Sequence, residues 1–120
     1  MKDHTRRAVA YIAGRIISGN NSSFVYDYSC TKHFSMAGNV GDSVLIYDYS
    51  EGCHIAGSGT ATSTLSLYHY GNRKHIQIII NGSNFSGYDY DTSRHYSGQV
   101  NGGTISLYDY EHSKHFNYLI

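Results

Sequence analysis

After residue 20, hydrophobic and polar residues alternate in short runs that turn-forming residues separate. One kind of run is Thr104–Tyr110 (TISLYDY), and the other is Lys74–Ile80 (KHIQIII). Alternation with a period of two is typical of β-strands that bury one face. Asn81-Gly82 and Asn101-Gly102 lie between such runs, and Asn-Gly is a strong hairpin signal. The pattern predicts short antiparallel strands joined by tight turns.

The runs repeat about every twenty residues. Each copy holds a triplet, Tyr-Asp-Tyr or once Tyr-His-Tyr, and a His five residues after the second Tyr. The first Tyr residues are Tyr26, Tyr47, Tyr68, Tyr88 and Tyr108, and the second are Tyr28, Tyr49, Tyr70, Tyr90 and Tyr110. The histidines are His33, His54, His75, His95 and His115. Five hairpins over residues 22–120 predict an all-β antiparallel meander of about ten strands, and closing the edges predicts a closed or nearly closed barrel.

A solenoid with one coil per copy is the alternative architecture. It would stack Asp27 beside Asp48 at roughly 4.8 Å, and like charges directly opposite each other are destabilising. A meander places equivalent residues two strands apart, so we favour the meander.

An amphipathic helix is predicted over residues 3–18. Its apolar residues follow the i, i+3, i+4, i+7 pattern at Val9, Ile12, Ala13 and Ile16. Asp3 or Thr5 is expected to cap its start, and Gly19 to end it. We expect the helix to pack on the sheet, where it could plug or cap an apolar barrel interior. A basic helix lying on a membrane surface is the alternative.

Alternation also assigns the faces of the sheet, with the second Tyr of each triplet expected to pair with the His across the hairpin. The predicted inner face comprises Phe34, Met36, Val44, Ile46, Leu65, Leu67, Ile76, Ile78, Ile80, Phe85, Gly87, Tyr96, Val100, Ile105, Leu107, Phe116, Tyr118 and Ile120. The predicted outer face carries both Tyr of each triplet, the His and small polar residues.

The Asp residues of the triplets share the inner parity and need partners. The expected partners are basic residues across each hairpin, in the pairs Asp27–Lys32, Asp89–Arg94 and Asp109–Lys114. Such pairs at one rim of the barrel would help to set register more than stability. The second copy has Cys53 instead of the basic residue, the third has His69 instead of Asp, and the fourth has Gly87 on its inner face. We interpret these departures as sequence drift.

Composition and charge narrow the function classes. At 120 residues the chain is expected to form one domain, residues 1–120. Thirteen Tyr and 13 Gly without Pro agree with β structure and tight turns. Nine basic and nine acidic side chains cancel, so a nucleic-acid partner is not expected. Cys30 and Cys53 are expected to be free thiols.

No run approaches the ~20 apolar residues of a transmembrane helix. The N-terminal residues combine positive charge with an apolar stretch, as signal peptides do, but Arg15 interrupts that stretch. We expect a cytoplasmic protein; a signal peptide and homo-oligomerisation both stay open.

The sequence contains no G-x-S-x-G, P-loop, C-x-x-C or H-E-x-x-H motif, so no catalytic residue, metal ligand or cofactor is predicted. The fifteen Tyr and His residues of the outer face are the candidate binding residues, for a protein or a carbohydrate partner. A purely structural role of this face is one alternative. A metal-dependent or hydrolytic enzyme that uses His residues of adjacent copies is the other.

The segment "YDYEHSKHF" resembles the YD repeats of Rhs-type and teneurin-type shell proteins, which follow Tyr-x-Tyr-Asp, a short turn and Gly-Arg-Leu. Tyr108, Tyr110 and Glu111 stand where that pattern has Tyr, Tyr and the acidic residue. The Gly-Arg pair is Lys114-His115 here, and three copies lack the acidic residue. The resemblance covers residues 24–116 loosely and implies β-hairpin repeats that curl into a wall. It transfers no catalytic residue, and five copies are too few to enclose another domain.

Overall fold

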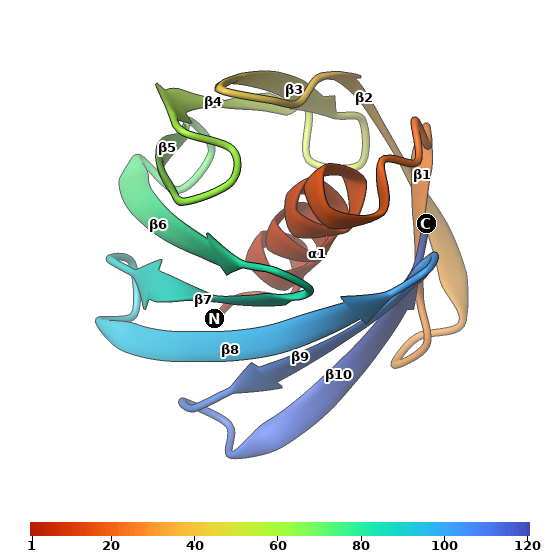
Figure 1. Cartoon of the computed structure of the whole chain (residues 1–120). Helices are drawn as coiled ribbons and strands as arrows, with labels where there is room; N and C mark the ends of the chain where they lie inside the picture. Colours follow the sequence, from red (N-terminus) through yellow and green to blue (C-terminus); the bar gives the residue numbers. More distant parts are fainter.

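The computed structural model describes all 120 residues as one helix inside a ten-stranded barrel. The elements are α1 (Asp3–Ser18), β1 (Phe24–Asp27), β2 (Lys32–Asn39), β3 (Ser43–Asp48), β4 (Cys53–Gly59), β5 (Thr64–His69), β6 (Lys74–Asn81), β7 (Asn84–Asp89), β8 (Arg94–Asn101), β9 (Thr104–Asp109) and β10 (Lys114–Leu119). Consecutive strands pair antiparallel, and β1 pairs with β10 to close the barrel (Figure 1). The predicted meander with one N-terminal helix is confirmed, and the barrel is closed.

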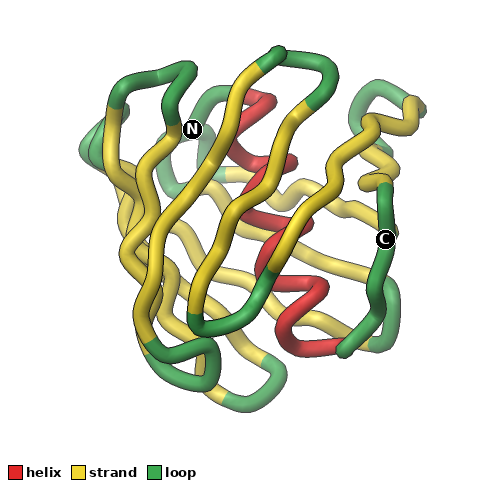
Figure 2. The backbone as a smooth tube through the Cα atoms, turned by 90° about the horizontal axis from the view of Figure 1, so that it is seen from above, coloured by secondary structure: helices red, strands yellow, loops and turns green.

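Helix α1 runs through the barrel, and the strands surround it (Figures 1 and 2). Every residue from Thr5 to Gly14 is buried, although the apolar pattern covers only one face of the helix. The physical reason is barrel size: about eight strands make a lumen that side chains alone can fill, and a wider barrel encloses a cavity. The helix is therefore the plug of the barrel. The membrane-surface alternative is wrong, because the buried segment leaves no face for lipid.

The two ends of α1 differ from each other. Gly19 has φ 73° and its N–H donates to the carbonyl oxygen of Arg15 at 3.0 Å, so the predicted helix end is confirmed. The expected N-terminal caps are wrong, since the N-cap residue is Lys2 and no side chain caps the helix. The candidate caps have other partners. Asp3 forms an ion pair with Arg6, and the Thr5 hydroxyl accepts a hydrogen bond from the side-chain amide of Asn72 at 2.8 Å.

The core consists of α1 and the inner faces of the strands. Of the residues predicted for the inner face, only Phe34 is partly exposed, and all the others are buried. Core burial of this kind is what holds the helix inside the barrel, because each fully buried Leu or Ile side chain contributes roughly 1.5–3 kcal/mol.

The hairpin register differs from the expected one by two residues. The first Tyr of each triplet pairs with the His, as in Tyr108 with His115, and Asp109 lies directly opposite Lys114. The shift is even, so every residue keeps its face. The second Tyr instead begins a four-residue loop, in which Ser113 has a positive φ of 51°.

Candidate functional site

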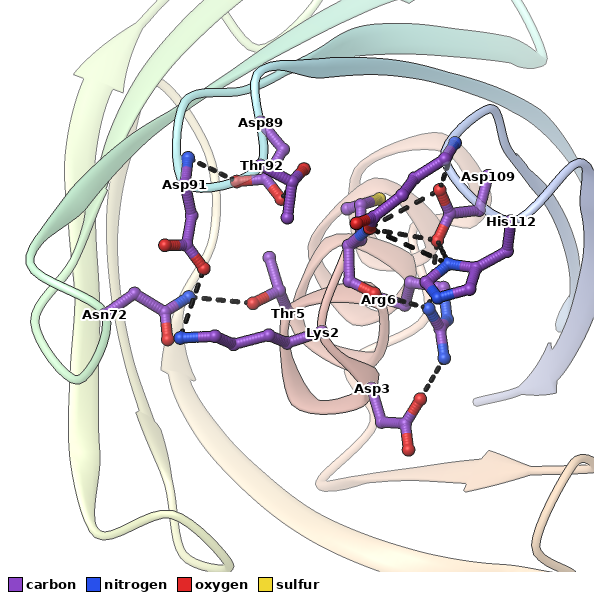
Figure 3. A network of polar contacts seen from close by, with 12 residues as sticks. Lys2, Asp3, Thr5, Arg6, Asn72, Asp89, Asp91, Thr92, Asp109 and His112 are labelled. Carbon is purple, nitrogen blue, oxygen red and sulfur yellow. Dashed lines mark hydrogen bonds and ion pairs between the residues drawn. The ribbon is translucent and has the colours of Figure 1, made fainter.

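The central residues of the five triplets end the odd-numbered strands at one end of the barrel, where residues of the first turns of α1 contact them. They are Asp27, Asp48, His69, Asp89 and Asp109, and all five are buried. Figure 3 shows two of them, Asp89 and Asp109, near this end of the helix. We call this end of the barrel the polar mouth.

Each central side chain holds the hairpin loop that follows it. Oδ1 of Asp48 accepts the backbone N–H of Ser50 at 3.0 Å, and Oδ1 of Asp89 accepts the N–H of Asp91 at 3.0 Å. In the third copy, Nδ1 of His69 takes the same role and accepts the N–H of Asn72. Such side-chain-to-backbone bonds are how Asp favours turns. The central position is therefore architectural.

The expected cross-strand ion pairs do not form. Lys32, Arg94 and Lys114 are exposed, and none of them forms an ion pair with a carboxylate. The buried Asp oxygens already accept hydrogen bonds from their own hairpin loops, and burying an ammonium beside them would cost hydration free energy. The prediction of a rim of Asp–Lys pairs is wrong.

Cations from the helix take that place at two of the copies. Arg6 bonds to Asp109 at 2.9 Å with its guanidinium over the Phe116 ring, 3.7 Å from the centroid. Arg7 lies 3.4 Å from Asp27 and 3.7 Å from the centroid of the Phe34 ring. Burial by itself would raise the pKa of Asp109, but the bonds from His112, the Met1 amino group and Arg6 lower it below its ordinary value. These contacts join helix α1 to the first hairpin, β1–β2, and to the last hairpin, β9–β10.

Two departures from the repeat lie next to each other at the polar mouth. The Sγ atom of Cys53 and the ring of His69 lie on the same side of Gly71, and the His4 ring lies 5.1 Å from the His69 ring. Burial, followed by the neighbouring His4, lowers the pKa of His69 to about 4. Burial also raises the pKa of the Cys53 thiol, which disfavours the reactive thiolate. The group therefore lacks an activated nucleophile.

A cluster of possible metal ligands was not predicted from the sequence. Asp109, Glu111 and His112 bring one ligand atom each within 4.8 Å of one another. Their D-x-E-H spacing within a hairpin loop is the only sequence signal. The buried carboxylate already accepts bonds from Arg6 and the Met1 amino group, so cationic groups of the chain occupy its free side.

The fifteen predicted Tyr and His residues form five aromatic triads on the outer wall. In each triad the first Tyr packs edge-on against the second at 4.8–5.0 Å between ring centroids, and against the His at 4.6–5.0 Å. The second Tyr residues are 51–62% exposed. The structure thus brings the residues of each copy together.

Grooves of one design lie between neighbouring triads at two steps around the barrel, and a further recess beside Tyr108 and His115 adjoins the second of them. The Cys53 groove is lined by Leu45, Gly52, Cys53, His54, Ala56 and Tyr70. The Arg94 groove is lined, among others, by Gln77, Ser93, Arg94, His95, Ser97 and Tyr110. The two grooves are lined by residues at equivalent positions of their copies. Gly52, Cys53 and His54 of the first groove correspond to Ser93, Arg94 and His95 of the second. Ala56 and Tyr70 correspond in the same way to Ser97 and Tyr110.

The small residue two positions after the His lines each groove, and we call it the floor residue; it was not predicted as a site residue. It is Ala56 in one groove and Ser97 in the other, whereas Gln77 and Asn117 hold this position in the third and fifth copies. A short side chain two positions after the His is the sequence signal that could have identified it.

Histidines of adjacent copies do not converge. They lie two strands apart in the barrel, for example His54 on β4 and His75 on β6, which is roughly 10 Å at the normal strand spacing. Zinc needs ligand atoms at about 2.0–2.2 Å. The wall therefore offers no shared site to such a pair.

Helix α1 lacks the length and the apolar character that a membrane-spanning helix requires. Comparison of the chain with protein-family models, curated proteins and solved structures finds no significant match, and the resemblance to YD repeats stays a prediction.

Proposed function

We propose that this protein is a non-enzymatic carbohydrate-binding module whose sites are the grooves between the aromatic triads. The observation that carries the proposal is the recurrence of one groove design at two equivalent places. Aromatic packing that served stability alone would not require a groove, and here equivalent grooves occur in two copies.

The lining of the grooves suits a sugar ring. Exposed Tyr70 and Tyr110 each offer an amphipathic ring, with an apolar body for the C–H face of a saccharide and a hydroxyl for its edge. The groove of Tyr110 also contains the uncharged polar side chains of Gln77, Ser86 and Ser97, besides Arg94. Their hydroxyl and amide groups can donate and accept hydrogen bonds, which is what a polyol requires.

Charge favours a carbohydrate over a nucleic acid. The ionised side chains gather at the polar mouth and its hairpin loops, except for Arg15 and Asp42. The chain carries no net charge, whereas affinity for nucleic acids rests largely on many phosphate contacts. Two grooves on one rigid barrel would also raise the affinity for a repetitive glycan through multivalency.

The enzyme alternative has less support. At the polar mouth the Cys53 thiol lies beside His69, and the pKa of this thiol is raised, which disfavours the thiolate. The histidines of the wall are separated as described above. A binding role needs neither group to react.

The proposal is tested by screening the protein on a glycan array and measuring the binding of each retained saccharide by calorimetry. Tyr70→Ser and Tyr110→Ser are the test variants, and Tyr28→Ser is the matched control, because Tyr28 is equally exposed and lines neither groove. We expect each test variant to weaken binding at its groove by about 3- to 10-fold, the value of one aromatic contact. The proposal fails if no saccharide is retained, or if the double variant binds like the unchanged protein.

A further inference from the structure

We propose that the Arg94 groove binds an acidic saccharide, with the Arg94 guanidinium receiving its carboxylate or sulfate. The inference rests on the proposed carbohydrate-binding function and adds the class of ligand.

Arg94 has no partner within the protein. It is exposed, and its guanidinium takes part in no ion pair and no hydrogen bond, although Asp89 lies directly opposite on β7. Asp89 is buried, and its oxygens accept the N–H of Asp91 and the hydroxyl of Thr92, each at 3.0 Å. The guanidinium is therefore left free at the rim of the groove.

The neighbours of Arg94 complete a site for an anion carried on a sugar. His95 and Tyr110 flank it, and Ser97 and Gln77 line the wall beside them. A guanidinium can bind a carboxylate or a sulfate through two parallel N–H bonds, and it is less strongly hydrated than an ammonium. The aromatic ring and the uncharged polar groups remain available for the sugar itself.

The Cys53 groove provides an internal comparison. It has the same layout, but Cys53 stands at the position of Arg94, so no cation lines it. It should therefore bind saccharides without regard to their charge. Lys114 stands at the equivalent position of the fifth copy, but its ammonium lies 5.3 Å from the centroid of the inward-facing Phe116 ring, toward the polar mouth.

The single guanidinium of the Arg94 groove argues against a polyphosphate backbone as the ligand. Nucleic acids are held through several phosphate contacts, and the wall around the Arg94 groove adds no further Lys or Arg to its lining. A single acidic group on an otherwise neutral, hydroxylated ligand matches what the groove offers.

The test compares three oligosaccharides with one backbone, in neutral, uronic-acid and sulfated form, by calorimetry at low salt. The variants are Arg94→Gln, Lys114→Gln as a control with the same change of charge, and Cys53→Arg as a gain of function. We expect the unchanged protein to prefer at least one acidic form by about tenfold, the value of a charged hydrogen bond. Arg94→Gln should abolish this preference, Lys114→Gln should keep it, and Cys53→Arg should extend it to the second groove. The uronic-acid and sulfated arms distinguish the two anions.

Three results would overturn the inference. The first is an acid preference that Arg94→Gln leaves unchanged, and the second is an acid preference that Lys114→Gln removes equally. The third is the absence of any acid preference in the unchanged protein. Because Arg94 is exposed and unbonded, the variant should keep the thermal unfolding temperature of the unchanged protein. If none of the three saccharides and no array glycan binds, the proposed function itself fails, and that outcome differs from neutral binding without acid preference.

Discussion

Tyr96 on β8 lies directly opposite Gly87 on β7, and its ring fills the space that a side chain at Gly87 would need. A Cβ atom at Gly87 would lie 2.6 Å from Cζ of Tyr96 and would overlap the carbonyl oxygen of Gln77. The Tyr96 hydroxyl donates to that same carbonyl oxygen at 2.6 Å. The other copies place a Leu, Ile or Val in the position of Gly87. Gly87 is thus a packing partner of Tyr96, and the interpretation of this departure as drift is wrong.

Gly87→Ala should destabilise the protein by roughly 2–4 kcal/mol, because overpacking and a weakened Tyr96 hydrogen bond add up. Urea unfolding measures the change. Combining Gly87→Ala with Tyr96→Phe removes part of the clash, so the double variant should lose less than the sum of the two single losses. A Gly87→Ala protein within 0.5 kcal/mol of the unchanged one would contradict this account.

Thr31→Gly should stabilise the protein by up to about 1 kcal/mol. Thr31 ends the first hairpin loop with φ 52°, which is a strained region for a β-branched residue, and Gly52 holds the equivalent place in the second loop with φ 64°. The greater freedom of Gly in the unfolded chain offsets part of the gain. Gly52→Ser is the reverse control and should destabilise the protein in the same urea assay. A destabilised Thr31→Gly protein, or a Gly52→Ser protein as stable as the unchanged one, would disprove strain at this position.

Acid should unfold the protein partly through His69. The unfolded chain takes up this proton near pH 6.5, but the folded protein does so only near pH 4, because burial and then His4 lower the pKa. Stability should therefore be unaffected above pH 6.5 and fall by about 3 kcal/mol as the pH is lowered to 4. His69→Asn keeps an acceptor for the N–H of Asn72 and should remove this part of the pH dependence. The exposed His115→Asn is the control for the substitution itself, and the loss of stability between pH 6.5 and 4 should remain in this variant.

Arg6→Met should destabilise the protein by roughly 3–5 kcal/mol, because it leaves the buried Asp109 carboxylate with fewer cationic partners. The double variant Arg6→Met with Asp109→Asn should recover part of the loss, which a double-mutant cycle measures. Lys114→Ala should cost less than about 0.5 kcal/mol, since Lys114 has no ion pair. If Lys114→Ala destabilised the protein more than Arg6→Met, Asp109 would pair with Lys114 across the hairpin, which would contradict the structure.

The floor residues should decide how many grooves can be occupied. Ala56→Gln and Ser97→Gln each place a long side chain where an open groove has a short one. Each variant should remove one binding site from the calorimetric stoichiometry of a saccharide that binds both grooves. Ser35→Gln is the control, because Ser35 has the same place in the first copy and lines neither groove. An unchanged stoichiometry in both variants would show that ligands bind elsewhere.

The local pattern was sufficient for the strands, their faces and the loops. Residues such as Ile105 and Leu107 alternate with Ser106 and Tyr108, and a period of two assigns inside and outside whatever surrounds the strand. The aromatic triads follow for the same reason, because a Tyr and a His of one hairpin are neighbours across a short loop. The exact register could not be predicted from alternation. It is associated with a loop in which the N–H of Glu111 donates to the Asp109 carboxylate.

The contents of the barrel and the contacts of helix α1 with its strands could be seen only in the tertiary structure. No periodicity in residues 3–18 indicates that Arg6 and Arg7 are buried, because their counter-charges Asp109 and Asp27 lie far away in the sequence. The grooves depend in the same way on distant residues: Tyr110 reaches the strand of His95 only because β8 and β9 pair. The strands of the barrel wall could thus be predicted from the sequence, because alternation is a local property. The buried helix, its ion pairs and the grooves could not, because each of them forms between segments that only the closed barrel brings together.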